Sequence, residues 1–206
     1  MKSRAEIKVR AKALIKENYT MALVPNLLYV LIAAVAASIT FGLGFIITLP
    51  LLVGVMLVYI MFWRSENPSL EIMFTGAFQE NFVRKLGGIL WMELFIFLWS
   101  MLFCIPGIVK SYSYAMTPYI LAKYPNVEAK EALKLSMRIM NGHKLELFIL
   151  DLSFIGWNLL GGLTFGLLNL FYVSPYMSIS RAGFLDEVMY DALSRNVIDA
   201  SELKIG

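Results

Sequence analysis

Two carboxylates interrupt otherwise apolar stretches of the sequence and are the clearest candidates for a chemical role. Asp151 lies nine residues after Gly142 in "GHKLELFILDLSFIGWNLLGG", and Glu93 lies within "ILWMELFIFLW". On a helix that rises about 1.5 Å per residue, Asp151 would lie about 13 Å beyond Gly142. An ionised Asp in the middle of a membrane helix costs about 2.5–3.5 kcal/mol on insertion scales. We therefore expect Asp151 to be paired, hydrogen-bonded or protonated.

Asp151 has two interpretations that the sequence leaves open. In the first, it belongs to a proton or cation path, with Glu93 as the comparable acid, because such paths recruit several ionisable groups. In the second, it bridges helices through Asn169, Tyr172 or the Ser/Tyr-rich fourth span, Gly107–Ala122.

Polar and small residues accompany Asp151 at helical spacing. Asn158 and Gly162 follow it at i+7 and i+11, so they share its helix face, which we expect to contact other helices. Asn26 and Glu93 lie at broadly similar depths in two other apolar segments, which makes a shared polar centre a hypothesis. The candidate intramembrane polar site comprises Asp151, Glu93, Asn158, Asn26 and Asn169.

Other chemistry has little support in the residue types. His143 and Lys144 fit an interfacial anchor and a helix cap. A hydrolase using His143, Glu146 and Ser136 would lack the G-x-S-x-G nucleophile pattern. One cysteine and one histidine exclude disulfide frameworks and Cys/His metal sites. P-loop and Rossmann signatures are absent from the sequence. We therefore expect no enzyme activity, no cofactor and no metal.

The composition predicts a membrane protein. Of 206 residues, 59% are hydrophobic and 16% are charged, and the mean hydropathy is +0.68. A soluble fold cannot hide that much apolar surface. The apolar runs are continuous and lack the alternation of barrel strands, so we expect an all-α polytopic protein.

Three long apolar segments each predict a helical hairpin, giving about six transmembrane helices. Met21–Trp63 is interrupted by "TFGLG", Leu86–Tyr124 by "CIPGIVK", and Leu145–Ser180 by "GGLTFG". Glycine and proline favour turns at these positions. The arms Gly107–Ala122 and Leu145–Gly161 are short for a bilayer span, so a re-entrant or interfacial hairpin also stays open.

The basic residues predict the topology. Segments 1–20, 64–85, 123–144 and 181–206 hold seventeen of the eighteen Lys and Arg residues, with Lys110 as the exception. Basic loops stay cytoplasmic, so both termini should be cytoplasmic and the hairpin tips should face outward. The expected partners are anionic lipid headgroups at the cytoplasmic face, with a homo-oligomer or a membrane-protein partner also possible, and no nucleic acid.

Amphipathic helices are predicted between the hairpins and at both ends, along the inner leaflet. The first eighteen residues place Ile7, Ala11, Leu14 and Ile15 on one face. A cleavable signal peptide is a rival interpretation of this end. A second helix should begin at an Asn126 N-cap and end at Gly142. "SLEIMFTGAF" and the tail "FLDEVMYDALSRNV" repeat the pattern.

An internal repeat is also predicted. "KENYTMAL" at 16–23 aligns with "QENFVRKL" at 79–86, and "TFGL" occurs at two hairpin tips. The single membrane domain 1–206 then divides into repeats 1–63, 67–122 and 126–181, followed by a C-terminal amphipathic tail 183–206.

Several motifs together resemble one bacterial family. "SYSYAMTPYILA", "AKEALKLSMRIMNGHK", "FILDLSFIGW" and "SPYM" are similar, in this order, to the integral-membrane family catalogued as domain of unknown function number nine hundred seventy-five. The resemblance implies a multi-pass protein of the bacterial cytoplasmic (inner) membrane and gives no residue a role.

The expected function is non-enzymatic. The sequence favours a membrane scaffold or accessory subunit that binds lipid or a partner protein. The alternative is a small transporter or permease-like protein that uses Asp151 and Glu93, and a third possibility is a lipid-modifying enzyme around His143.

Overall fold

The computed structural model describes residues 2–39, 44–79 and 81–204. All regular secondary structure in these ranges is helical, as the apolar runs predicted. The first hairpin consists of α2 (Tyr19–Ile39) and α3 (Phe45–Trp63). The second consists of α5 (Phe82–Leu102), α6 (Cys104–Ser113) and α7 (Thr117–Lys123). The third consists of α9 (Lys144–Leu152), α10 (Ile155–Leu163), a π-helical turn (Asn169–Val173) and α11 (Ser174–Ser194). The remaining elements are α1 (Arg4–Glu17), α4 (Leu70–Phe78), α8 (Ala129–Ile139) and a 3₁₀ turn (Ala200–Leu203).

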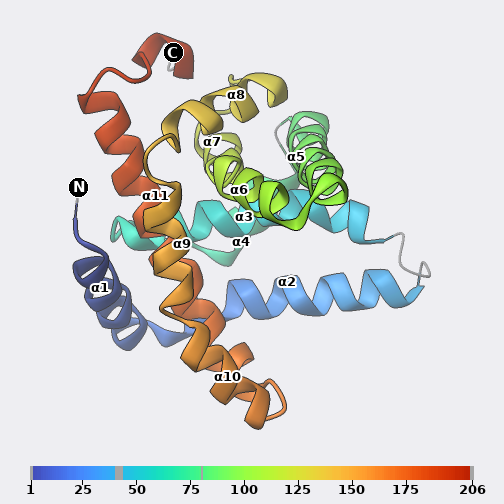
Figure 1. Ribbon diagram of the computed structural model, residues 1–206. Coiled ribbons are helices and arrows are strands. Elements are labelled where there is room, and N and C mark those ends of the chain that lie inside the picture. The colour runs from blue at the N-terminus through green and yellow to red at the C-terminus, as the bar shows by residue number, and fades with distance from the viewer. Residues whose placement is uncertain (1, 40–43, 80, 205–206) are drawn as a thin grey trace.

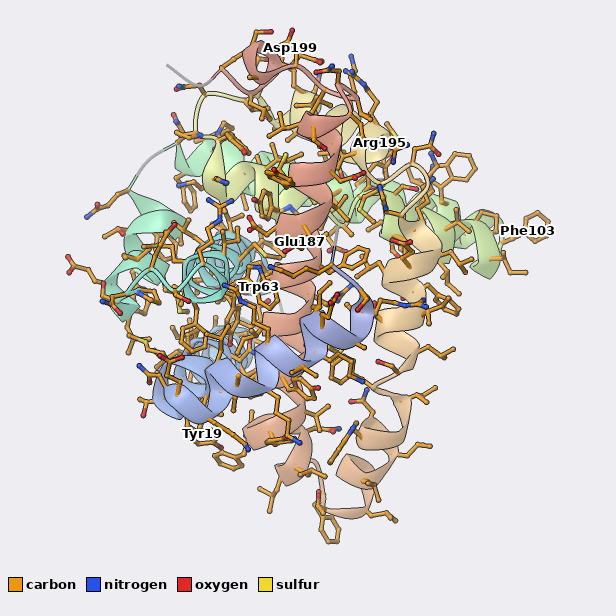
Figure 2. The ribbon with its side chains drawn as sticks, turned by 90° about the vertical axis from the view of Figure 1, so that its left-hand side faces the viewer. Tyr19, Trp63, Phe103, Glu187, Arg195 and Asp199 are labelled. Carbon is orange, nitrogen blue, oxygen red and sulfur yellow. The ribbon has the colours of Figure 1, made fainter. Side chains whose placement is uncertain are left out.

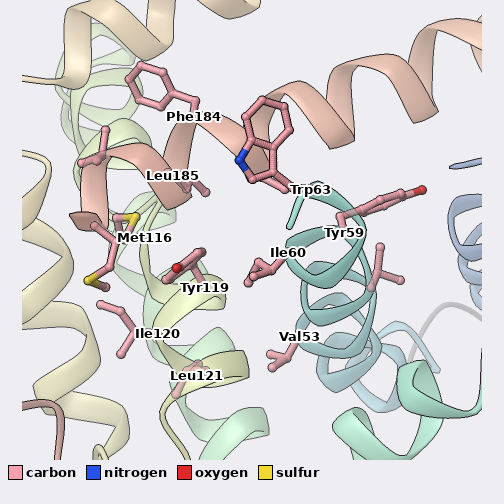
Figure 3. Packing of buried hydrophobic residues seen from close by; sticks show 14 of the residues in the cluster. Val53, Tyr59, Ile60, Trp63, Met116, Tyr119, Ile120, Leu121, Phe184 and Leu185 are labelled. Atoms are coloured by element: carbon pink, nitrogen blue, oxygen red, sulfur yellow. The ribbon is translucent and has the colours of Figure 1, made fainter. Parts of the chain in front are cut away.

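Helix α3 is the centre of the molecule, because it packs against α2, α4, α5, α7 and α11. Its last residue, Trp63, is 2% exposed and meets α11 at Gly183, where an added Cβ would lie 2.5 Å from the indole ring. Arg10 of α1 stacks on the same ring at 4.6 Å. Figure 3 shows Trp63, Tyr119 and Leu185 pointing into this core from three helices.

The three hairpins extend from the centre in different directions. In Figure 1, α2 runs to the right and α10 to the bottom, while α5 and α6 are viewed nearly along their axes. Figure 2, turned by 90°, places Phe103 at the far end of the α5–α6 hairpin. Each hairpin follows a separate helix, which is α1, α4 or α8. A common origin of the three units stays a prediction.

The turns lie close to the predicted ones. The first predicted turn lies largely at 40–43, outside the described residues. The second comes at Phe103, which is extended, so Pro106 falls in the first turn of α6, where no helix hydrogen bond is lost. The third uses Phe165 and Gly166 at φ values of 51° and 81°.

The helices predicted to lie on the inner leaflet pack their apolar faces against other helices of the protein. The apolar face of α1 is the predicted one, but Ile7 and Ala11 are fully buried against other helices, chiefly α11. In Figure 2, α1 lies across α11. Leu133 and Ser136 of α8 are buried in the same way. The prediction that these faces contact lipid was therefore wrong, because neighbouring helices bury them.

Two predicted boundaries also differ. The last predicted span and the tail from 183 are one continuous helix, α11, since Gly183 packs on Trp63 and gives no reason for a break. The N-cap of α8 is Glu128, and Asn126 donates its side-chain amide to the Lys204 carbonyl at 3.0 Å. Gly142 ends the α8 region as predicted, at a φ of 92°.

Two stretches of the described residues are long and apolar enough to cross a membrane. They are Tyr19–Ile39 and Lys144–Leu163, and both are mostly uncovered by the rest of the protein. Large apolar side chains are exposed along them, including Leu31, Val35 and Leu159. The six-span arrangement stays a prediction.

Candidate functional site

Asp151 has two partners that hold its carboxylate between three helices. Its Oδ2 accepts a hydrogen bond from the Tyr112 hydroxyl of α6 at 3.1 Å and lies 3.3 Å from Nη2 of Arg181 on α11. Its Oδ1 is buried and has no hydrogen-bond partner among the described residues. The structure therefore gives Asp151 a bridging position, and its Tyr112 partner comes from the predicted Ser/Tyr-rich stretch.

Arg181 links Asp151 to a cavity of about 370 Å³, here called the Arg181 cavity. Asn26 of α2 and Glu93 of α5 line this cavity together with Arg181 and Ser178 of α11. The Asn26 side-chain amide donates to Ser178 Oγ at 3.0 Å. Asn26 and Glu93 thus line the same cavity as Arg181, and Asp151 lies behind its wall, paired with Arg181.

Two other predicted residues lie elsewhere. Asn158 is exposed on α10, and Gly162 has open space where its Cβ would be, so the predicted polar stripe does not contact other helices. The reason is a turn at 153–154, which separates α9 from α10 and shifts the helical register. Asn169 packs against Gly161 in the third hairpin, away from the cavity lining.

His143 and Lys144 lie where α8 is joined to α9. His143 Nδ1 lies 3.3 Å from Glu146 Oε2, and its Nε2 lies 3.5 Å from Asp191 Oδ2 on α11. Lys144 is the first residue of α9. The histidine thus joins two helices, and its role as an interfacial anchor stays a prediction.

The serine proposed for hydrolysis has its hydroxyl committed elsewhere. Ser136 is fully buried, donates to the Ser113 carbonyl at 2.9 Å and accepts from the Met116 N–H at 3.1 Å. These bonds hold α8 against the turn between α6 and α7. Ser136 is therefore a structural link.

A second charged cluster surrounds Asp186 of α11. Arg64 donates to Asp186 Oδ1 at 2.5 Å, and the Tyr119 hydroxyl donates to the same oxygen at 2.6 Å. Lys123 Nζ lies 3.4 Å from the Tyr119 oxygen, and burial lowers the pKa of this amine. The cluster ties the ends of α3 and α7 to α11.

Sequence reasoning missed Arg181, because it was counted as a flanking charge of the last loop. A signal was present, since Ser174, Ser178 and Arg181 follow at i, i+4 and i+7 and therefore share one helix face. Chemically, the paired charges and amide groups can hold a small polar or ionic solute, or they can hold the helices together.

Comparison with known proteins identifies one family. Residues 102–192 match the model of the family described as "Protein of unknown function (DUF975)", which confirms the resemblance over that part of the chain. The matched segment includes Tyr112, Asp151 and Arg181, whereas Asn26 and Glu93 precede it. The searches of curated proteins and of solved structures gave no match.

Proposed function

We propose that the chain is an integral membrane protein of the bacterial cytoplasmic membrane that acts as a non-enzymatic scaffold or accessory subunit. It binds lipid or a partner protein through its helical hairpins. The observation that carries this proposal is the exposed apolar surface of the two candidate spans, α2 and α9–α10.

Large apolar side chains are exposed along both stretches. Val30, Leu31, Val35 and Ile39 of α2 are 46–72% exposed, and Leu159 and Leu163 of α10 are 70% and 80% exposed. Soluble monomers seldom expose contiguous apolar patches beyond a few hundred Å². Burying such side chains is worth about 1.5–3 kcal/mol each, so a bilayer or another protein is expected to cover them.

The scaffold role agrees with how the polar groups are used. Asp151, Ser136 and Asp186 each join helices from different parts of the chain. In a membrane such bonds hold helices together, since there is no water to replace them. The remaining topology, with both termini cytoplasmic and up to six spans, follows from the distribution of basic residues.

Transport is the second candidate, and the Arg181 cavity favours it. Asn26, Glu93 and Arg181 offer an amide, an acid and a guanidinium to one small solute in the cavity. A pH-dependent flux that Asp151→Asn abolishes at normal protein abundance would favour transport. Lost abundance with no flux in either form would favour the bridging role.

The test of the scaffold proposal has two steps. Membranes from the native host are washed with alkaline carbonate, which we expect to leave the protein in the pellet. Gentle-detergent purification then identifies co-purifying lipids and proteins. Release into the carbonate supernatant, or an isolated monomer without specific lipid or partner, would contradict the proposal.

A further inference from the structure

A groove of about 530 Å³ lies between α5, α6 and α8, well separated in the sequence from Asp151. Its floor is a row of aromatic side chains on one face of α5, Trp91, Phe95 and Trp99, spaced at i, i+4 and i+8. Trp91 and Phe95 stack at 5.7 Å. Leu133 and Met137 of α8 complete the apolar wall.

Three lysines surround this floor, and the term lysine–aromatic groove refers to all these residues. Lys110 comes from α6, while Lys130 and Lys134 come from one face of α8. No acidic residue is among the described residues that line the groove. Within the described residues, none of the three lysines forms a salt bridge.

Two of the three lysines lie over aromatic rings. Lys110 Nζ lies 5.0 Å from the centroid of the Trp99 ring, and Lys130 Nζ lies 5.9 Å from that of Trp91. Such cation–π contacts are worth about 0.5–1 kcal/mol at exposed sites, which fixes the amines near the groove without neutralising them. Three like charges around one groove repel one another, so an anion bound there is favoured.

We propose that the lysine–aromatic groove binds one anionic phospholipid. The headgroup phosphate meets the three lysines, and one acyl chain lies along the three aromatic side chains of α5. This inference rests on the proposed membrane location and adds a defined site to it.

The surroundings of the groove select a lipid as the occupant. The aromatic row is 36–41% exposed, and Leu94, Phe97 and Leu98 extend the apolar surface of α5 beside it at 45–60% exposure. A ligand with a long apolar tail can cover both surfaces, whereas its charged end reaches the lysines. Basic pockets between membrane helices on the cytoplasmic side bind anionic headgroups for this reason.

The same arrangement explains the one basic residue that did not fit the charge pattern. The six-span map places Lys110 near an outward hairpin tip, away from the segment 123–144. In the structure, Lys110 Nζ lies 3.9 Å from Met137 Sδ of α8, which belongs to that segment. Lys110 therefore lies beside the basic residues of α8, and the α5–α6 hairpin does not separate it from them as a full membrane span would.

Fluorescence quenching tests the proposal directly, because Trp91 and Trp99 lie in the groove. The full chain carrying Trp157→Phe is placed in nanodiscs of phosphatidylcholine with an equal fraction of brominated phosphatidylglycerol or brominated phosphatidylcholine. Trp63 is 2% exposed and supplies an unquenched baseline. We expect brominated phosphatidylglycerol to quench the emission more strongly.

A matched pair of double variants isolates the lysines. Lys130→Gln/Lys134→Gln should weaken the relative affinity for phosphatidylglycerol about 30-fold, at roughly one kcal/mol per lysine near a membrane surface. Lys12→Gln/Lys16→Gln removes the same charge from exposed i, i+4 positions of α1 and should leave the preference unchanged. All four lysines are exposed, so both variants are expected to fold.

Each outcome bears on the proposal. Equal quenching by the two brominated lipids, or an equal loss of preference in the two double variants, would overturn the lipid site. Either result leaves the protein in the nanodisc, so the proposed membrane location would stand. A protein that does not incorporate into nanodiscs would instead contradict the membrane proposal itself.

Discussion

Asp151 and Arg181 form the pair on which the polar centre depends. The Asp151 side chain is 13% exposed, whereas Arg181 is 40% exposed where it enters the Arg181 cavity. The carboxylate is thus held in an apolar setting by Arg181 and the Tyr112 hydroxyl together. Removing its charge leaves the arginine without its partner.

We expect Asp151→Asn to lower stability by about 1–3 kcal/mol, less than for a fully buried pair because Arg181 is partly solvated. The measurement is the fraction of detergent-solubilised protein that remains monodisperse after heating. Arg195→Gln, which breaks the more exposed Arg195–Asp191 pair, is the control and should cost at most about 1 kcal/mol. An equal loss of stability in the two variants would show that the Asp151–Arg181 pair stabilises the protein no more than a surface pair does.

Gly183 is the second residue at which a substitution has a defined expected effect on stability. A Cβ at this position would lie 2.5 Å from the Trp63 ring, so Gly183→Ala should destabilise the core by about 1–3 kcal/mol. Gly162→Ala is the control, because open space surrounds that position and alanine favours the helix by up to about 1 kcal/mol. Thermal unfolding in detergent compares the two, and an unchanged transition in Gly183→Ala would contradict the packing described here.

The residue types of the polar centre were predictable, and their geometry was not. Asp151, Glu93 and Asn26 stand out because polar groups are rare in apolar runs. Arg181, which pairs with Asp151 and lines the same cavity as the other two, lies in a segment where basic residues are expected anyway, so composition gives it no distinction. Asn158 failed because a turn at 153–154 broke the helical register assumed for it.

At the scale of elements, the C-terminal turn is held by exposed charges. Lys204 Nζ lies 2.8 Å from Glu131 Oε2, and Arg138 Nη1 lies 2.6 Å from Glu202 Oε2. The Lys204 side chain and the Glu128 backbone donate to Glu131, which lowers its pKa. The Arg138 side chain and the Asp199 backbone do the same for the pKa of Glu202.

The pH dependence follows from these lowered pKa values. A carboxyl group whose pKa is lower in the folded state stabilises it above the unfolded value, about 4.3 for Glu. That contribution is lost as the pH falls through the folded pKa. We therefore expect the turn Ala200–Leu203 to lose hydrogen-exchange protection below about pH 4.

A variant separates this effect from general acid unfolding. Arg138→Gln should expose the same turn to exchange already at pH 7. Arg195→Gln is the control, since the Arg195–Asp191 pair lies within α11 and joins no second element. Protection that is unchanged in Arg138→Gln would show that the charges do not hold the turn.

Helix positions were largely predictable because apolar periodicity and turn residues mark them. The buried face of α1 was also identified correctly from its spacing. The surface that buries it was not, since an amphipathic face fits a lipid surface and a protein surface equally well. Periodicity predicts which side of a helix is buried, but it does not predict whether protein or lipid buries that side.

At the scale of the whole molecule, the proposed function requires that α2 and α9–α10 lie in a membrane. Other helices of the same molecule expose apolar residues too, as Val9 of α1 does at 71%. Exposure in the isolated chain therefore does not separate a membrane-facing side chain from a water-facing one. Only the surrounding medium makes that difference.

Cysteine accessibility distinguishes a membrane-facing side chain from a water-facing one. Single cysteines at Val9, Val35 and Leu159, which are 71%, 56% and 70% exposed, are introduced into a Cys104→Ser chain. Inverted membrane vesicles expose the cytoplasmic face and are treated with a membrane-impermeant maleimide, before and after detergent is added. We predict rapid labelling at Val9→Cys in both conditions, and protection of Val35→Cys and Leu159→Cys until the detergent is present. Equally rapid labelling of all three positions in intact vesicles would contradict a membrane location for these helices.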